Sequence, residues 1–237
     1  MLKTSVLEFP AGNVLNEYPP FLSEAADELP DVPALPETLL TMEFQLHESS
    51  VDLRKFSDAV LGDLGATIQI LRLAGREYEF AEDCPTRIED CISDLGLTAC
   101  FNAVSRGTLS RSSQQRANFE IWTHSREIAQ HFRALAEEAP GAVSPDQAYV
   151  AGLLHAIGAL PEVLGWHWSE TPSNRALSAL KLAERWRLPR YVKDFFCETV
   201  MPGYNTHWSE LLATAHHLAR TNWARCPLKD VQARSFA

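Results

Sequence analysis

The sequence predicts an all-α protein, and three observations support this prediction. Apolar residues recur at the three- and four-residue spacing of amphipathic helices over most of the 237 residues. Capping residues stand just before several apolar segments, as Asp52 and Ser144 do. The alternation of apolar and polar residues that is typical of half-buried strands is not found in the chain.

The first expected helix begins at Pro36, because proline has a suitable φ and needs no N–H partner in the first turn. Asp52 is the expected cap of a second helix. Gly62 and Gly65 are expected to bracket a short turn, and a third helix follows it and ends at Gly75.

A fourth helix is expected from the pair Thr86 and Glu89, which has the spacing of a capping box. Gly96 is expected to break this helix, and a fifth continues to about residue 104. The polar residues of 105–118 then form the best internal boundary, since they lack apolar periodicity.

The second half of the chain begins with a long helix predicted over 119–138, on which Ile121, His124 and Ile128 share a face. Ser144 followed by Pro145 marks the start of a central helix in the stretch 144–160. Its residues 148–154 are almost wholly apolar, as in a buried helix. Three further helices are expected in the segments 173–186, 189–199 and 208–223.

Composition limits the possible functions. The chain has 21 Lys and Arg against 31 Asp and Glu, a formal charge of -10, which disfavours a broad nucleic-acid-binding surface. No apolar run is long enough to span a bilayer, and the N-terminus has no signal-peptide core, so we expect no membrane association and a cytoplasmic location. No glycine-rich nucleotide-binding motif is present, and no cofactor is expected.

Several short motifs occur in an order and spacing that a known family shares. They are Leu-Pro at 35–36, Leu-Arg-Leu-Ala at 71–74, Leu-Gly-Leu at 95–97, Trp-Thr-His-Ser at 122–125, Ala-Gly-Leu-Leu-His-Ala-Ile-Gly at 151–158 and Leu-Pro at 188–189. Together they resemble the HDOD family, a non-catalytic relative of HD-type metal phosphohydrolases that is found in bacterial signalling proteins.

The resemblance implies an HD-domain-like multi-helix bundle with a smaller N-terminal helical lobe. The HDOD-like domain is expected at 31–223, with the N-terminal lobe at 31–105 and the HD-like lobe at 119–223. An irregular lead-in at 1–30, rich in proline and acidic residues, precedes it, and a tail at 224–237 follows.

The same resemblance locates a degenerate site. His124 and His155 match the first two metal-binding histidines of HD enzymes, but Ala156 stands where the shared aspartate of the His-Asp pair is expected. The later aspartate falls near 215–217, where the chain has no carboxylate. Hard ions such as Mg²⁺ need oxygen ligands, so hydrolytic metal catalysis is not expected.

For this pocket we expect His124 and His155 to line a vestigial ligand site, with no catalytic residues and no bound metal. If a metal binds at all, the ligands are expected to be His124, His155 and one of His216 or His217, with His216 preferred, and the ion a softer one such as Zn²⁺.

The sequence is therefore compatible with three functions. The first is a non-catalytic signalling module that binds a partner protein or a small ligand. The second is a metal-dependent phosphohydrolase with an altered ligand set, acting on a nucleotide or cyclic dinucleotide. The third, a nucleic-acid-associated regulator, is disfavoured by the net charge. The sequence does not identify a partner or an oligomeric state.

Overall fold

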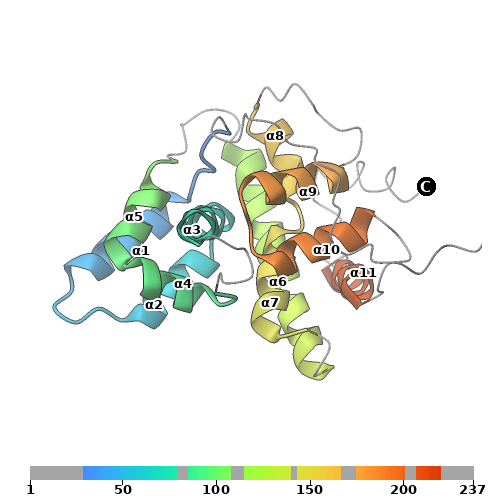
Figure 1. Ribbon diagram of the computed structural model, residues 1–237, viewed down its shortest axis with the longest axis horizontal. Helices are drawn as coiled ribbons and strands as arrows, with labels where there is room; N and C mark the ends of the chain where they lie inside the picture. Colours follow the sequence, from blue (N-terminus) through green and yellow to red (C-terminus); the bar gives the residue numbers. More distant parts are fainter. Residues whose placement is uncertain are drawn as a thin grey trace, which may run out of the picture.

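A computed structural model describes residues 29–78, 85–107, 115–139, 143–166, 175–200 and 207–219 of the protein. Within 115–139, side chains are described from residue 120 onward. Every regular element in these ranges is a helix (Figure 1), which confirms the predicted all-α class. The lead-in up to residue 28 and the chain after residue 219 lie outside the described residues. None of the described helices combines the length and the apolar character needed to cross a bilayer.

The first half of the chain forms five short helices. They are α1 (Pro36–His47), α2 (Leu53–Leu61), α3 (Leu64–Glu77), α4 (Ile88–Leu95) and α5 (Leu97–Ser105). Helix α3 is the centre of this group, since it packs against α2, α4 and α5 on one side and against α6 and α7 on the other (Figure 1).

The second half is built around α6 (Gln115–Glu138), the longest helix described, and α7 (Pro145–Leu154), which packs along it. The remaining elements of this half cover the pair: η1 (Ile157–Ala159), α8 (Leu160–Val163), α9 (Arg175–Arg185), α10 (Arg190–Val200) and α11 (His207–Ala219). Helix α10 contacts α7 and α9, and α11 contacts α6 and α10.

Two helix starts follow the predicted caps. The Asp52 carboxylate accepts from the N–H groups of Arg54 and Lys55 at 3.1 and 3.3 Å. The Ser144 hydroxyl accepts from the Gln147 N–H at 3.2 Å, with Pro145 in the first turn of α7. These side chains satisfy backbone donors that the helix itself leaves open.

Two glycine predictions are wrong. Gly75 does not end α3, which continues to Glu77, and Gly65 lies inside the first turn of α3. Both glycines are required by close packing: a Cβ on Gly65 would lie 1.9 Å from the Pro33 carbonyl oxygen, and one on Gly75 would lie 2.3 Å from that of Arg187. Glycine here permits the approach of another backbone segment and does not mark a chain turn.

The capping box predicted for Thr86 and Glu89 does not form. Helix α4 begins one residue later than that box requires, with Arg87 at the N-cap position and no side-chain cap. The Glu89 carboxylate instead accepts from the Arg87 guanidinium at 2.9 Å. The Glu89 carboxylate, which the capping box would have used, is therefore paired with Arg87.

The central helix is shorter than the predicted stretch 144–160. Helix α7 ends at Leu154, and the chain then turns into η1 and α8. Pro161 gives a physical reason, because a proline inside a continuous helix has no N–H to donate and its ring collides with the carbonyl four residues earlier. Pro161 thus excludes one continuous helix through this stretch, and His155 is the C-cap residue of α7.

Asp63 joins the two halves of the molecule. Its fully buried carboxylate accepts from the backbone N–H groups of Leu35, Gly65 and Ala66 at 2.6, 2.8 and 3.2 Å, and from the Trp122 indole N–H at 2.8 Å. Burial raises the pKa of Asp63, while hydrogen bonds from Leu35, Ala66, Trp122 and the Thr38 side chain lower it. Because these groups all donate to it, the ionised carboxylate matches them best. We call this group the Asp63 junction.

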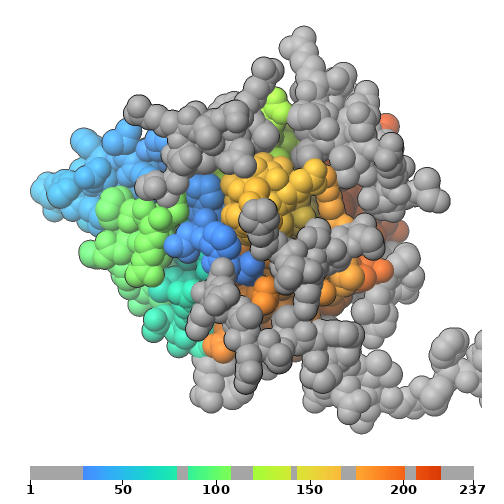
Figure 2. Space-filling model, turned by 90° about the horizontal axis from the view of Figure 1, so that it is seen from above, coloured from blue at the N-terminus to red at the C-terminus, as the bar shows by residue number. Residues whose placement is uncertain are grey.

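The segment before α1 reinforces this joint. It runs between α5 and the 155–163 region, as the dark blue atoms of Figure 2 show. The Gln69 amide donates to the Val32 carbonyl at 3.1 Å, and the Arg72 guanidinium lies 3.3 Å from the Asp31 carboxylate and over the Trp186 ring. The first two contacts hold the segment before α1 against α3, and the third connects α3 to the residue that follows α9.

Candidate functional site

His124 lies on the buried face of α6. It belongs to the predicted face with Ile121 and Ile128, and all three side chains are buried. The same face continues through Phe132, which packs edge-on against Phe195 of α10 with ring centroids 6.0 Å apart. Helical periodicity thus directs His124 toward the interior between α6, α7 and α11.

His155 follows the last residue of α7, where the helix ends. The helix is wholly buried from Ala148 to Leu154, and it approaches α6 closely because Gly152 has no side chain. A Cβ at this position would lie 2.9 Å from both Ala129 Cα and Phe132 Cγ. The close approach of the two helices brings His155 next to His124.

His216 comes from α11. This helix buries Trp208, Ala215 and Ala219, and its first turn is held by the Glu198 carboxylate, which accepts from the Trp208 N–H at 3.2 Å. His216 lies on the side of that buried stripe, half-buried, whereas His217 is exposed. The structure therefore selects His216 from the two histidines that the sequence left open.

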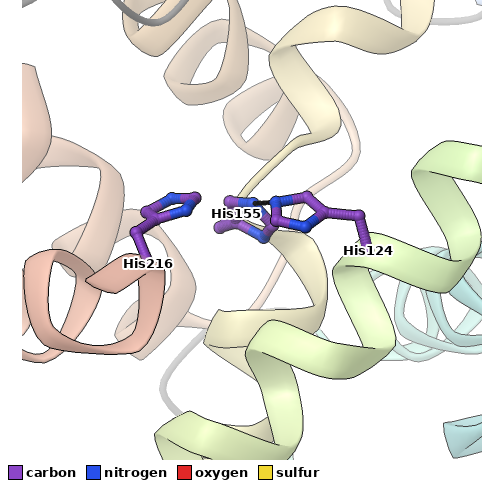
Figure 3. Close-up of side chains that lie close together, drawn as sticks. All are labelled: His124, His155 and His216. Atoms are coloured by element: carbon purple, nitrogen blue, oxygen red, sulfur yellow. Dashed lines mark hydrogen bonds between the residues drawn. The ribbon is translucent and has the colours of Figure 1, made fainter. Parts of the chain in front are cut away.

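The three imidazoles converge on one point (Figure 3). The Nε2 atoms of His124 and His155 are 3.2 Å apart. Ring centroids are separated by 5.0 Å for His124 and His155, 5.1 Å for His155 and His216, and 5.6 Å for His124 and His216. One nitrogen from each ring lies within 4.8 Å of the other two. We call these residues the histidine cluster.

A backbone carbonyl sets the orientation of His155. Its Nδ1 lies 2.7 Å from the Gly152 oxygen, a distance at which the Nδ1–H donates to the carbonyl. The Nε2 atom then carries a lone pair that faces His124, so the hydrogen between the two Nε2 atoms belongs to His124.

The electrostatic environment favours neutral imidazoles. Burial, followed by the charge of His216, lowers the pKa of His124 to about 3. Burial lowers the pKa of His155 well below its ordinary value, and His124 and His216 add to this effect. Desolvation disfavours the charged form of an imidazole, and like charges at these distances do the same.

The donor set does not fit the metal of an HD hydrolase. Within the described part of the chain, no Asp or Glu joins the three histidines in a group of ligand spacing. Mg²⁺ and Mn²⁺ prefer carboxylate, carbonyl and water oxygens. Three imidazole nitrogens are instead a ligand set known for Zn²⁺.

Sequence reasoning found all three histidines but missed two residues that position them. Gly152 allows the contact between α6 and α7 and supplies the carbonyl that orients His155. Glu198 holds the start of α11. A glycine within an apolar helix was a sequence signal for Gly152. No local pattern pointed to Glu198, since its hydrogen-bond partner, Trp208, is on another helix.

The family follows from this fold and from a match to a family model. The HDOD domain model matches residues 32–164, more than half of the chain, and the protein belongs to the HDOD family. A search of curated proteins finds no match.

Two solved structures are similar in fold. The response regulator MmoQ from Methylococcus capsulatus strain Bath has 19% identity and a TM-score of 0.66, with 86% of this chain and 92% of that chain covered. A virulence factor from Campylobacter jejuni subsp. jejuni has 18% identity and a TM-score of 0.55, with 81% and 78% covered. At these identities, the similarity establishes the helical architecture alone.

Proposed function

We propose that this protein is a non-catalytic regulatory module of the HDOD type, which acts by binding a partner protein or a small ligand. The observation that carries the proposal is the position of Ala156. By the resemblance to HD enzymes, this residue directly after His155 corresponds to their aspartate, and no described carboxylate joins the histidine cluster. Without anionic ligands the site lacks the charge and the oxygen donors that a hydrolytic divalent ion needs.

Two further findings support a regulatory role. Family membership is established, and one protein of similar fold is described as a response regulator. In the proposed role the histidine cluster is a vestigial pocket, and His124 and His155 contribute to ligand binding or to stability. A partner from a signalling system is the expected binding molecule, and no membrane or nucleic acid takes part.

A hydrolysis assay tests this proposal. The full chain is incubated with nucleoside phosphates and cyclic dinucleotides in the presence of Mg²⁺, Mn²⁺, Fe²⁺ or Zn²⁺, beside the variant His155→Ala. We expect no hydrolysis above the protein-free rate from either protein. A metal-dependent rate that the variant loses would overturn the proposal and support the alternative, a phosphohydrolase with an altered ligand set.

A further inference from the structure

The histidine cluster contains more polar groups than a packing role requires. Three imidazoles from three helices meet in a largely buried place, and each costs free energy to remove from water. Apolar side chains would fill the same volume without that cost. We infer that His124, His155 and His216 together bind one Zn²⁺ ion, with a fourth coordination position left for water or for a ligand.

The separation of the first two ligands fits this ion. Zinc–nitrogen bonds of about 2.0–2.1 Å in a tetrahedral arrangement place neighbouring nitrogens about 3.3 Å apart. The Nε2 atoms of His124 and His155 are 3.2 Å apart. A zinc ion fits between them with little movement of α6 or α7, once the hydrogen of the neutral His124 ring moves from Nε2 to Nδ1 and frees the Nε2 lone pair.

The third ligand requires a side-chain adjustment. The ligand nitrogens of the cluster lie within 4.8 Å of one another, so a separation at that limit must close by about 1.5 Å to reach the tetrahedral value. His216 can supply this movement because its side chain is half-buried and not enclosed on every side. Its partial exposure also gives the ion a route from solvent.

The orientation of His155 is already that of a zinc ligand. Metal-bound histidines commonly donate their second ring N–H to a carbonyl or carboxylate, which fixes the tautomer and directs the free nitrogen at the metal. The Gly152 carbonyl has this role, at 2.7 Å from Nδ1. This contact exists without a metal, so part of the cost of ordering the site is met by the fold.

The chemistry of the cluster also selects the kind of metal. Imidazole nitrogens suit Zn²⁺, Ni²⁺ and Cu²⁺, whereas Mg²⁺ and Mn²⁺ need oxygen ligands that the described cluster does not supply. The inference goes beyond the proposed function and does not depend on it, because a zinc ion can stabilise a regulatory module or hold a ligand without any hydrolysis.

Zinc titration of the full chain, without an affinity tag, tests the inference. Isothermal titration and elemental analysis are expected to give one Zn²⁺ per chain for the natural protein and none for His216→Ala. The exposed neighbour on the same helix provides the matched control, since His217→Ala should keep full binding. His155→Ala is a second variant that should also lose the ion.

Two further readouts test site geometry. At a Zn²⁺ concentration about a hundred times Kd, Tm should rise by about 5–10 °C in the natural protein and His217→Ala, and should not rise in His216→Ala. Co²⁺ should give the strong visible absorption of a four-coordinate site.

The outcomes separate this inference from the proposed function. Absence of stoichiometric Zn²⁺, equal binding by His216→Ala, or equal binding of Mg²⁺ would overturn the zinc site and leave the regulatory role untouched. Zinc binding together with hydrolysis would overturn the regulatory role and keep the zinc site.

Discussion

The Asp63 junction and the histidine cluster are both buried polar groups between helices, but they differ in how their members match one another. At the junction one carboxylate receives four N–H donors, three of them from the backbone. In the cluster three side chains of the same chemical type face a common point. At the Asp63 junction, the carboxylate and its donors are all parts of the protein. In the histidine cluster, the three nitrogens match a cation, which must bind from solution.

This difference separates a structural polar group from a candidate binding site. A buried carboxylate surrounded by donors is stable only where the fold holds those donors, so Asp63 makes the contact between α1, α3 and α6 specific. The three imidazoles share one hydrogen bond, between His124 and His155, and each presents a ring nitrogen to the other two. Burial alone therefore does not show which polar residue is functional. What distinguishes the two groups is whether the neighbouring side chains supply the hydrogen-bond partners that the buried residue needs.

Breaking the junction should have the largest effect. Asp63→Ala leaves four buried N–H groups without their acceptor and removes the cap of α3, so we expect the free energy of unfolding to fall by about 3–5 kcal/mol. Urea denaturation measures this. Asp52→Ala removes a more exposed cap from α2 and should cost only about 1 kcal/mol. Equal losses in the two variants would contradict the special role of Asp63.

The substitution Gly152→Ala should disturb the histidine cluster without changing any of its histidines. The added methyl group meets Ala129 and Phe132 at 2.9 Å, so α6 and α7 must separate, at a cost of about 1–3 kcal/mol. The shift should also weaken zinc binding in a titration. Gly62→Ala is the control, since φ is -72° there and the nearest atom lies at 3.3 Å. Unchanged stability and zinc affinity in Gly152→Ala would show that the helix contact is adaptable.

A smaller change to the junction sharpens the comparison. Trp122→Phe removes the indole N–H while the three backbone donors to Asp63 remain, so we expect a loss of about 1–2 kcal/mol in urea denaturation. Zinc binding should be unchanged. A double-mutant cycle with Asp63→Ala should show a coupling energy above about 0.5 kcal/mol, and additive effects would mean that this hydrogen bond contributes little.

The smallest effect is expected at the surface contact between the two halves. Asp146 pairs with Arg87 at 3.3 Å and with Arg133, but all three side chains are 41–52% exposed. Asp146→Asn should therefore cost less than about 1 kcal/mol, and the difference from the natural protein should shrink in high salt. A loss of about 3 kcal/mol or more would show that this exterior contact matters as much as the Asp63 junction.

Local patterns predicted the helices well where the determining residues are close in sequence. The caps at Asp52 and Ser144 depend on donors two or three residues away, and both were predicted correctly. The predictions for Gly65 and Gly75 were wrong because their close neighbours, Pro33 and Arg187, are distant in sequence. The division into lobes at 31–105 and 119–223 stays a prediction.

The sequence by itself determined the all-α class and the family resemblance, because these depend on residue type and local spacing. Only the tertiary structure decided that His216 and not His217 joins His124 and His155, and that Asp63 receives the Trp122 indole. Both results depend on how distant helices pack, and packing orientation is set by contacts between segments that no local pattern contains.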